Sequence, residues 1–496
     1  MTLRKKAIHG VKWSIIQETA GQMIDFFSII ILARLLGPKD FGLVAMATVI
    51  IASLRPFISQ GLGAAIIQRS ELDDEHLDTV FWSSFICGCL LAVVLAASAQ
   101  WWAVVFSEPQ LKNILPWLSA NVVLISLTVV QEAILRRNLN LKVYAIRATT
   151  GKIIGGVIGI TFAFYGFGVW SLIIRILVTS FVSVFLLWSL SNWRPRFFFS
   201  RKHFRELFPF GIRVLMTELM VFVNRQSDNL LISYFLGSTA LGLYNAAYRL
   251  MALVMRLVSG TTAQVGMPAF ARLQDDKDRL WKAFYAVTQL IALLVFPIFL
   301  GMLVLVPEII TILLGDQWGQ SVNVLQILLL IGILQCMLSP IISILVGSGK
   351  PGLRLKLQVI DAIVNLIGFF IAVHWGIVWV AASYVIVGYA MTPLWYWAVS
   401  TVVDVHWAAY IKLVMRPLMI SIVMMLGIVV AKSMVWTDVL GINVVADIVY
   451  IALSVVGAML IYFSMIYWLY PSALNKMLDI AKTVFVGTKQ RSVDGG

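Results

Sequence analysis

The sequence is poor in charge, in cysteine and in histidine. Asp, Glu, Lys and Arg make up 12% of its 496 residues and hydrophobic residues 60%, whereas soluble domains carry about 25% charged residues. The three cysteines lie in apolar stretches, which favours buried hydrophobic roles and predicts no disulfide framework. The five histidines are scattered along the sequence and form no ligand pattern. We therefore expect neither a metal site nor a cofactor.

The sequence also lacks the motifs of an ATP-driven pump and the domains of a membrane enzyme. Gly347–Lys350 has neither the glycine spacing of a phosphate-binding loop nor the Ser or Thr that follows the lysine there. The longest connection expected on the outer side, Pro307–Ser321, is too short for the catalytic domain of a polysaccharide polymerase or ligase. We therefore expect a protein that is not an enzyme and that acts within the membrane.

Apolar runs that are long enough to cross a bilayer recur along the whole chain. A transmembrane helix needs about 20 mostly apolar residues, and this criterion predicts an all-α polytopic membrane protein with about fourteen spans. The spans are predicted to begin near Trp13, Phe41, Val80, Ile114, Ile146, Phe167, Phe210, Leu241, Ala283, Val322, Leu355, Ile377, Leu413 and Val444. Turns at Tyr165–Gly168 and His374–Gly376 are required, because each neighbouring pair of spans would otherwise form one overlong run.

The basic residues predict the orientation of these spans. A net charge of +14 would suggest nucleic-acid binding in a soluble protein. Here most of the 38 Lys and Arg gather in one set of alternate loops, and the other set holds only Lys39, Lys112 and Lys432. Because Lys and Arg accumulate in cytoplasmic loops, we expect cytoplasmic termini, an even number of spans and no nucleic-acid partner. Basic loops such as Arg194–Arg205 either contact anionic lipids or a partner enzyme, or only fix the topology.

Two parts of the sequence resemble each other at an offset of 200 residues. Leu36–Leu43 aligns with Leu236–Leu243, and each segment is the predicted outer turn of a helical hairpin. Each copy holds six predicted spans, so both copies enter the membrane from the same side and form a parallel repeat, which transporters use for alternating access. We predict one lobe at 1–200, a second lobe at 201–406, and two extra spans with a cytoplasmic tail at 407–496.

Acidic residues are predicted inside the first and seventh spans. An ionised side chain costs on the order of 3 kcal/mol there, so it usually lines a cavity or pairs with another charge. Glu18 and Asp25 share one face of the first span, and Glu218 and Asp228 share one face of the seventh. Glu18 and Glu218 are 200 residues apart, which predicts equivalent depths in the two lobes. These acids either bind a coupling proton or sodium ion, or serve as partners for arginines.

Arginines are predicted inside spans of both lobes. They are Arg55 in the second span, Arg213 and Arg225 in the seventh, and Arg249 and Arg256 in the eighth. Arginine stays charged and presents a planar fork to phosphate oxygens, so a cavity that contains these residues would suit a diphosphate headgroup. Alternatively, Arg225 pairs with Asp228, and arginines near helix ends, such as Arg213, extend to the interface.

Small and aromatic residues predict how the spans pack. Glycines at spacings of four, at Gly151, Gly155 and Gly159, allow a neighbouring helix to approach the fifth span closely. Tryptophans near span ends, including Trp101, Trp117 and Trp318, are expected to be interfacial anchors.

A set of segments together resembles the polysaccharide transporter family, which contains the Wzx-type oligosaccharide flippases. The segments are Leu32–Gly42, Gly63–Arg69, Tyr244–Arg249, Pro268–Asp276 and Leu313–Trp318. Their order and the chain length are similar to the exopolysaccharide branch. The resemblance implies the multidrug/oligosaccharidyl-lipid/polysaccharide exporter fold, with two six-helix lobes around a V-shaped cavity. It also implies transfer of undecaprenyl diphosphate-linked oligosaccharide to the outer leaflet of the bacterial cytoplasmic (inner) membrane.

The resemblance suggests site residues and leaves other functions open. Related lipid flippases carry cavity arginines in the first, second and eighth spans. Arg55, Arg249 and Arg256 lie in matching spans, whereas the arginine of the first span, Arg34, lies near its outer end. The alternatives are an ion-coupled drug exporter of the same fold, which needs an acidic cavity, a lipid II flippase, and a membrane polysaccharide polymerase or ligase. Expected partners are lipid-linked oligosaccharide, membrane lipids and the polysaccharide polymerase or export machinery.

Overall fold

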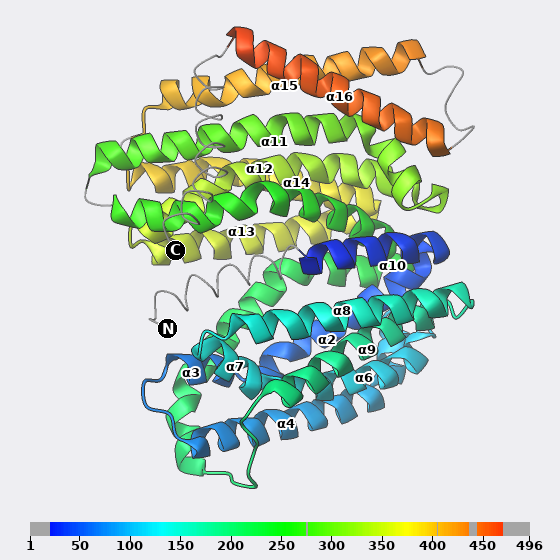
Figure 1. Ribbon diagram of the computed structural model, residues 1–496, viewed down its shortest axis with the longest axis vertical. Coiled ribbons are helices and arrows are strands. Elements are labelled where there is room, and N and C mark those ends of the chain that lie inside the picture. The colour runs from blue at the N-terminus through cyan, green and yellow to red at the C-terminus, as the bar shows by residue number, and fades with distance from the viewer. Residues whose placement is uncertain (1–19, 274–275, 404, 436–443, 470–496) are drawn as a thin grey trace, which may run out of the picture. The chain divides into compact units, whose positions relative to one another are not determined.

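The computed structural model describes residues 20–273, 276–403, 405–435 and 444–469, and these residues form helices joined by short turns (Figure 1). The first helix is described over 20–35. The following helices are α2 (Pro38–Ser59), α3 (Leu62–Gln68), α4 (Asp74–Ala97), α5 (Ala99–Val105), α6 (Leu111–Ser126), α7 (Val129–Arg137), α8 (Leu141–Phe164), α9 (Val169–Leu190), α10 (Arg201–Arg272), α11 (Lys277–Leu313), α12 (Ser321–Gly347), α13 (Pro351–Ala372), α14 (Ile377–Ser400), α15 (Trp407–Val435) and α16 (Val444–Leu469). Two 3₁₀ helices, η1 (Asp316–Trp318) and η2 (Val373–Trp375), complete the described elements. The predicted all-α fold is confirmed.

Within the described residues, 11 helical segments are long and apolar enough to cross a membrane. They coincide with the predicted second to sixth and ninth to fourteenth spans. The other predicted spans fall on the helix over 20–35 and on α10, which Gly237 interrupts with a φ of 80°. The predicted turns are confirmed, because α8 ends before Tyr165 and α14 begins after Gly376. The chain is a polytopic membrane protein, and the number of fourteen spans stays a prediction.

The described chain divides into two compact units. Unit 1 comprises Met1–Ala246, Leu313–Trp318 and Leu366–Val380, and unit 2 comprises Ala247–Ile312, Gly319–Asn365 and Ala381–Gly496. The lobes at 1–200 and 201–406 rest on the sequence repeat, and they stay a prediction.

Helices α8 and α9 pack closely in unit 1 through the predicted glycine face (Figure 1). A Cβ at Gly151 would lie 2.8 Å from the carbonyl oxygen of Thr179, and one at Gly159 would lie 2.7 Å from the Cβ of Arg175. One at Gly155 would overlap the hydroxyl of Thr179. The close helix approach predicted from this spacing is confirmed.

The two hairpin turns that are related by the offset of 200 residues contact each other in unit 1. A Cβ at Gly42 would overlap the carbonyl oxygen of Ser238, and a Cβ at Gly242 would overlap the carbonyl oxygen of Pro38. Pro38 corresponds to Ser238 and Gly42 to Gly242, so the two contacts are equivalent. A twofold-related pair of surfaces produces such reciprocal contacts. Because glycine has no side chain, the backbones of the two turns can come into contact at Gly42 and Gly242.

Trp318 belongs to the core of unit 1, and its predicted role as an interfacial anchor is wrong. Its side chain is 0% exposed, and its indole N–H donates a 3.0 Å hydrogen bond to the carbonyl of Ala33. The amide of Gln317 donates to the same carbonyl at 2.8 Å. Trp101 and Trp117 are largely exposed, as expected of tryptophans that face lipid headgroups.

Unit 2 is organised around α11. Buried residues of α11, α15 and α16 form one apolar cluster that includes Leu293, Met424 and Ile466. The hydroxyl of Tyr462 on α16 donates a 2.7 Å hydrogen bond to the carbonyl of Leu293, and Lys432 on α15 lies 2.5 Å from Glu308. These contacts fix the last two described helices against α11.

We expect Gly42→Ala to destabilise the protein, because the new methyl group would occupy the position of the Ser238 carbonyl oxygen. Overpacking of this kind lowers the free energy of unfolding by about 1–3 kcal/mol. The measurement is the apparent Tm of the purified full chain in detergent.

The matched control is Gly457→Ala on α16, where an added Cβ meets open space. Alanine favours a helix relative to glycine, so this control should keep or raise the Tm. Equal Tm values for the two variants would contradict the close backbone contact at Gly42.

Candidate functional site

A cavity of about 500 Å³ lies within unit 1, where the end of α2 meets α3, α7 and α10. Three arginines and two glutamates line it, together with smaller polar side chains. The charged and polar lining residues are Arg55, Ser59, Thr128, Glu132, Arg136, Glu218, Arg225 and Gln226. Three of the predicted site residues, Arg55, Glu218 and Arg225, therefore meet in one place.

The turn between α2 and α3 brings these residues together. Gln60 and Gly61 both adopt positive φ, which ends α2 and redirects the chain. A Cβ at Gly61 would overlap the carbonyl oxygen of Gly211 on α10, so only a residue without a side chain allows this approach. The approach lets the hydroxyl of Ser59 donate a 3.3 Å hydrogen bond to Glu218.

Arg55 and Arg225 supply positive charge that described acids neutralise only in part. Arg55 interacts electrostatically with Glu218 without forming a contact ion pair among the described residues. The guanidinium of Arg225 makes no hydrogen bond or ion pair with any residue that the structure describes. Both side chains are exposed to the cavity or the surface, so their donors can reach a ligand.

Asp228 is not the partner of Arg225 in the described structure. Its buried carboxylate accepts a 3.0 Å hydrogen bond from the hydroxyl of Tyr244 and a 2.7 Å bond from the backbone N–H of Asn229. Tyr244 follows the break at Gly237, so this bond joins the two parts of α10. The alternative of an internal Arg225–Asp228 ion pair is not observed among the described residues.

Glu132 and Arg136 complete the cavity, although the sequence did not predict Glu132 as a site residue. They lie four residues apart on α7. Arg147 on α8 binds Glu132 with an N–O distance of 2.7 Å, and Arg136 donates a 2.8 Å hydrogen bond to the hydroxyl of Tyr144. Arg136 also lies 3.8 Å from Glu132, so Arg55 and Arg225 are the lining arginines that form no contact ion pair with a described acid.

Asp25 forms an ion cluster elsewhere in unit 1. Its carboxylate lies 2.6 Å from Lys152 on α8 and 2.8 Å from Arg175 on α9. The side chain of Arg175 is 16% exposed. Asp25 was expected either to bind a coupling ion or to pair with a basic residue, and the structure supports the pairing. The resulting cluster joins three helices.

The remaining predicted site residues lie outside the described cavity lining or outside the described residues. Arg213 is exposed on α10 and is not among the residues that line the cavity. Arg249 and Arg256 belong to unit 2, where both are exposed and Arg256 donates to the carbonyl of Ala252 at 3.2 Å. Glu18 lies outside the described residues.

A pair of histidines at the beginnings of α4 and α10 was not predicted from the sequence. The rings of His76 and His203 lie 4.1 Å apart between centroids. Glu206, which precedes the predicted seventh span, lies 2.7 Å from Arg69 and 3.4 Å from His76. Hydrogen bonds from Arg69 and His76 lower the pKa of Glu206 below its ordinary value. No signal in the sequence relates His76 to His203, which is 127 residues away.

The fold defines a polytopic helical membrane protein, and similarity to known proteins assigns the family. Residues 31–323, more than half of the chain, match the family described as polysaccharide biosynthesis protein. The chain belongs to this family, and the resemblance to the polysaccharide transporter family is confirmed.

Individual relatives agree with this assignment, and a solved structure shares the fold. The succinoglycan biosynthesis transport protein ExoT of Rhizobium meliloti is 28% identical over 66% of this chain and 66% of its own length. The teichuronic acid biosynthesis protein TuaB of Bacillus subtilis is 24% identical over 96% of this chain and 98% of its own length. The lipid II flippase MurJ, in an inward closed conformation, shares the fold with a TM-score of 0.73 and 15% identity, covering 93% of this chain and 99% of MurJ.

We expect Asp25→Asn to destabilise the protein, because Lys152 and Arg175 would lose the carboxylate that neutralises them. Breaking a buried ion pair costs about 3–5 kcal/mol, and the partial exposure of this cluster reduces the expected cost to about 1–3 kcal/mol. The apparent Tm in detergent measures the effect.

Asp278→Asn is the matched control, since Asp278 is an exposed acid at the beginning of α11. Its Tm should fall less, because an exposed acid in the first turn of a helix contributes only about 0.3–1 kcal/mol. If Asp25→Asn keeps the Tm but removes the dependence of transport on an ion gradient, Asp25 binds a coupling ion and the structural role is refuted.

Proposed function

We propose that this protein is a flippase for undecaprenyl diphosphate-linked oligosaccharide repeat units in the bacterial cytoplasmic membrane. It supplies these units to exopolysaccharide, capsule or lipopolysaccharide biosynthesis. The single observation that carries the proposal is the arginine-lined cavity in a chain of the polysaccharide biosynthesis protein family. The name of ExoT, a transport protein for succinoglycan biosynthesis, supports the same substrate class.

The chemistry of the cavity fits the diphosphate. Guanidinium groups form paired hydrogen bonds with phosphate oxygens and stay charged at any physiological pH. Arg55 and Arg225 present such groups from α2 and α10, and neither is held by an ion pair with a described acid. Ligand pockets have volumes of about 300–1,000 Å³, so a cavity of about 500 Å³ accommodates a headgroup.

Transport proceeds by alternating access of the two predicted lobes. The turns around Gly42 and Gly242 form one contact between the lobes on the predicted outer side, and separation of the contacts on that side opens the cavity outward. Arg213, Arg249 and Arg256 contribute further positive charge along the path of the headgroup. Glu18, Glu218 and Asp228 are the candidate sites for a coupling ion.

The remaining features of the proposal concern location and partners. Both termini are cytoplasmic, because the basic loops lie on the side of the termini. The protein transports its substrate without chemical change and is therefore not an enzyme. The polysaccharide polymerase or the export machinery receives the translocated substrate.

Two rival transport functions differ in the ligand. A drug exporter of the same fold would bind cations in an acidic cavity, whereas arginines outnumber glutamates in this lining. A lipid II flippase would move the same diphosphate carrier with a different sugar and a peptide. Competition between lipid II and a lipid-linked oligosaccharide separates the second rival from the proposal.

Reconstitution of the full chain in liposomes tests the function directly. A fluorescent undecaprenyl diphosphate-linked oligosaccharide should exchange between leaflets in the presence of the protein. Lipid that reaches the outer leaflet of the liposome becomes accessible to a membrane-impermeant quencher, and the rate of quenching measures the rate of exchange. A fluorescent phospholipid without a diphosphate is the control and should not exchange faster. Absence of exchange under proton and sodium gradients of either direction would refute the proposal.

Arg55→Gln and Arg225→Gln should each lower the initial transport rate by about tenfold, the effect of losing one charge-assisted hydrogen bond of about 1.5 kcal/mol. Arg205→Gln removes an exposed charge near the beginning of the same helix as Arg225 and is the matched control. Its rate should stay within the error of the unmodified protein. Equal rates for all three variants would remove Arg55 and Arg225 from the binding site.

A further inference from the structure

The segment Leu313–Trp318, between α11 and α12, belongs to a different compact unit from the helices on either side of it. Its residues are part of unit 1, whereas the chain up to Ile312 and the chain from Gly319 onward are part of unit 2. We call this segment the strap. It joins two helices of unit 2 through contacts that it makes within unit 1.

The strap caps the end of the helix over 20–35. The last carbonyl groups of a helix have no hydrogen-bond partner within that helix. The indole of Trp318 and the amide of Gln317 donate to the carbonyl of Ala33 at 3.0 and 2.8 Å. The amide of Gln317 also donates a 3.2 Å hydrogen bond to the carbonyl of Leu36. Side chains from about 280 residues further along the chain therefore complete this helix end.

Two further contacts attach the strap to the first hairpin. The ring of Trp318 packs edge to face against Phe41 near the beginning of α2, with 5.4 Å between the ring centroids. The Nε of Arg34 donates a 3.3 Å hydrogen bond to the carbonyl of Leu313. The strap thus holds both helices of the hairpin, and its only large anchor is the buried indole of Trp318.

The attachment of the strap has the properties of a reversible contact. Gln317 is exposed, so water can replace the partners of its amide, and the net contribution of such a hydrogen bond is modest. Gly315, which leads into the strap, has a φ of 97°, and a Cβ added there would meet no atom within 4 Å. The turn at Gly315 is therefore unpacked and suited to bending. The strap can leave the hairpin without unfolding of the helices that it joins.

We propose that the strap is a releasable latch that holds the predicted outer side of the protein closed. When it is docked, it attaches the ends of α11 and α12 to the first hairpin, beside the contact between Gly42 and Gly242. When it is released, the hairpin turns are free to separate. Gln317 and Trp318 are positioning residues in this mechanism. The inference rests on the alternating access of the proposed function.

Cysteine labelling from the outer side tests the latch without any substrate. The reporter is Ala52→Cys in the unit 1 cavity, in a full chain whose Cys87 and Cys89 are replaced by Ser and whose remaining cysteine is buried. A membrane-impermeant maleimide is added to spheroplasts that express this chain. Gln317→Ala and Trp318→Phe each remove a donor of the cap, so each should raise the initial labelling rate about fivefold.

Gln326→Ala is the matched control, because the amide of Gln326 also donates to a backbone carbonyl, that of Leu303, at 3.2 Å. Both residues belong to unit 2, and neither belongs to the strap. This control should leave the labelling rate of Ala52→Cys unchanged, even where it lowers the apparent Tm as much as Gln317→Ala does. The labelling rate therefore separates a latch from a residue that only stabilises the fold.

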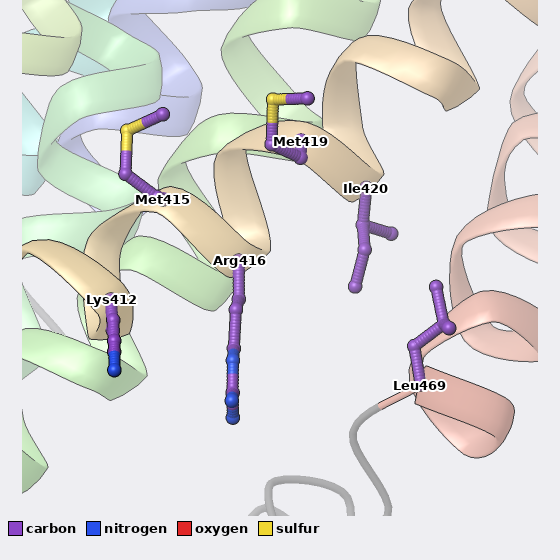
Figure 2. A pocket seen from close by; sticks show the side chains of 6 residues that line it. All are labelled: Lys412, Met415, Arg416, Met419, Ile420 and Leu469. Carbon is purple, nitrogen blue, oxygen red and sulfur yellow. The ribbon is translucent and has the colours of Figure 1, made fainter.

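A second reporter detects general loosening of the protein. Figure 2 shows Met419 on α15, among the residues that line a cavity of unit 2. Met419→Cys, in the same background, should be labelled equally slowly in all variants, because release of the strap does not alter α15.

The latch is refuted if Gln317→Ala and Trp318→Phe both label Ala52→Cys at the unmodified rate. It is also refuted if Gln326→Ala raises that rate as much, or if labelling of Met419→Cys rises in parallel. The proposed function fails separately. Lipid exchange with no change in labelling would refute the latch alone, and a change in labelling without lipid exchange would refute the flippase alone.

Discussion

The cost of an ionised side chain in hydrocarbon is the constraint on which the described arrangement depends. A charge within a span needs an opposite charge, a hydrogen-bonding partner or water. Asp25 meets two cations, and Glu132 meets Arg147. Arg55 and Arg225 instead line an open cavity without a contact ion pair among described residues. The charged residues of unit 1 thus form two groups. One group forms ion pairs that join helices, and the other lines the cavity, where it can bind a ligand.

Glycine determines where the cavity lies. At one end of α2, Gly42 and Gly242 allow two turns to touch, and just beyond the other end Gly61 allows the chain to approach Gly211. Both approaches require a residue without a side chain. The cavity lies beside the second contact, so Arg55, Glu218 and Arg225 owe their proximity to backbone contacts. The candidate site is therefore built by packing as well as by charge.

The sequence predicts the helices well because long apolar runs and glycine spacings are local signals. The turn at Gly376 and the packing face of Gly151–Gly159 were predicted in this way and are confirmed. Trp318 was predicted wrongly, because its position near a span end does not reveal that residues 313–318 pack over Ala33. Contacts between distant segments, such as His76 with His203, have no local signal at all.

The candidate site shows the same division. Charge within apolar runs identified Arg55, Arg225 and Glu218, and helical periodicity placed Glu218 and Arg225 on one face of the seventh span. Periodicity does not tell which helix a face meets, so the partners of Asp25 and the part played by Glu132 were not predicted. The hydrogen bond between Tyr244 and Asp228 crosses the break at Gly237. Only the structure therefore shows that Arg225 lines the cavity and does not pair with Asp228.

The central claim is that the arginines of the unit 1 cavity recognise a diphosphate. Equilibrium binding of undecaprenyl diphosphate and of undecaprenol to the purified full chain tests it most directly. The account predicts at least about tenfold tighter binding of the diphosphate, and loss of that preference when Arg55 and Arg225 are both replaced by Gln. Equal affinity for the two lipids, or a preference that survives the double replacement, would contradict it.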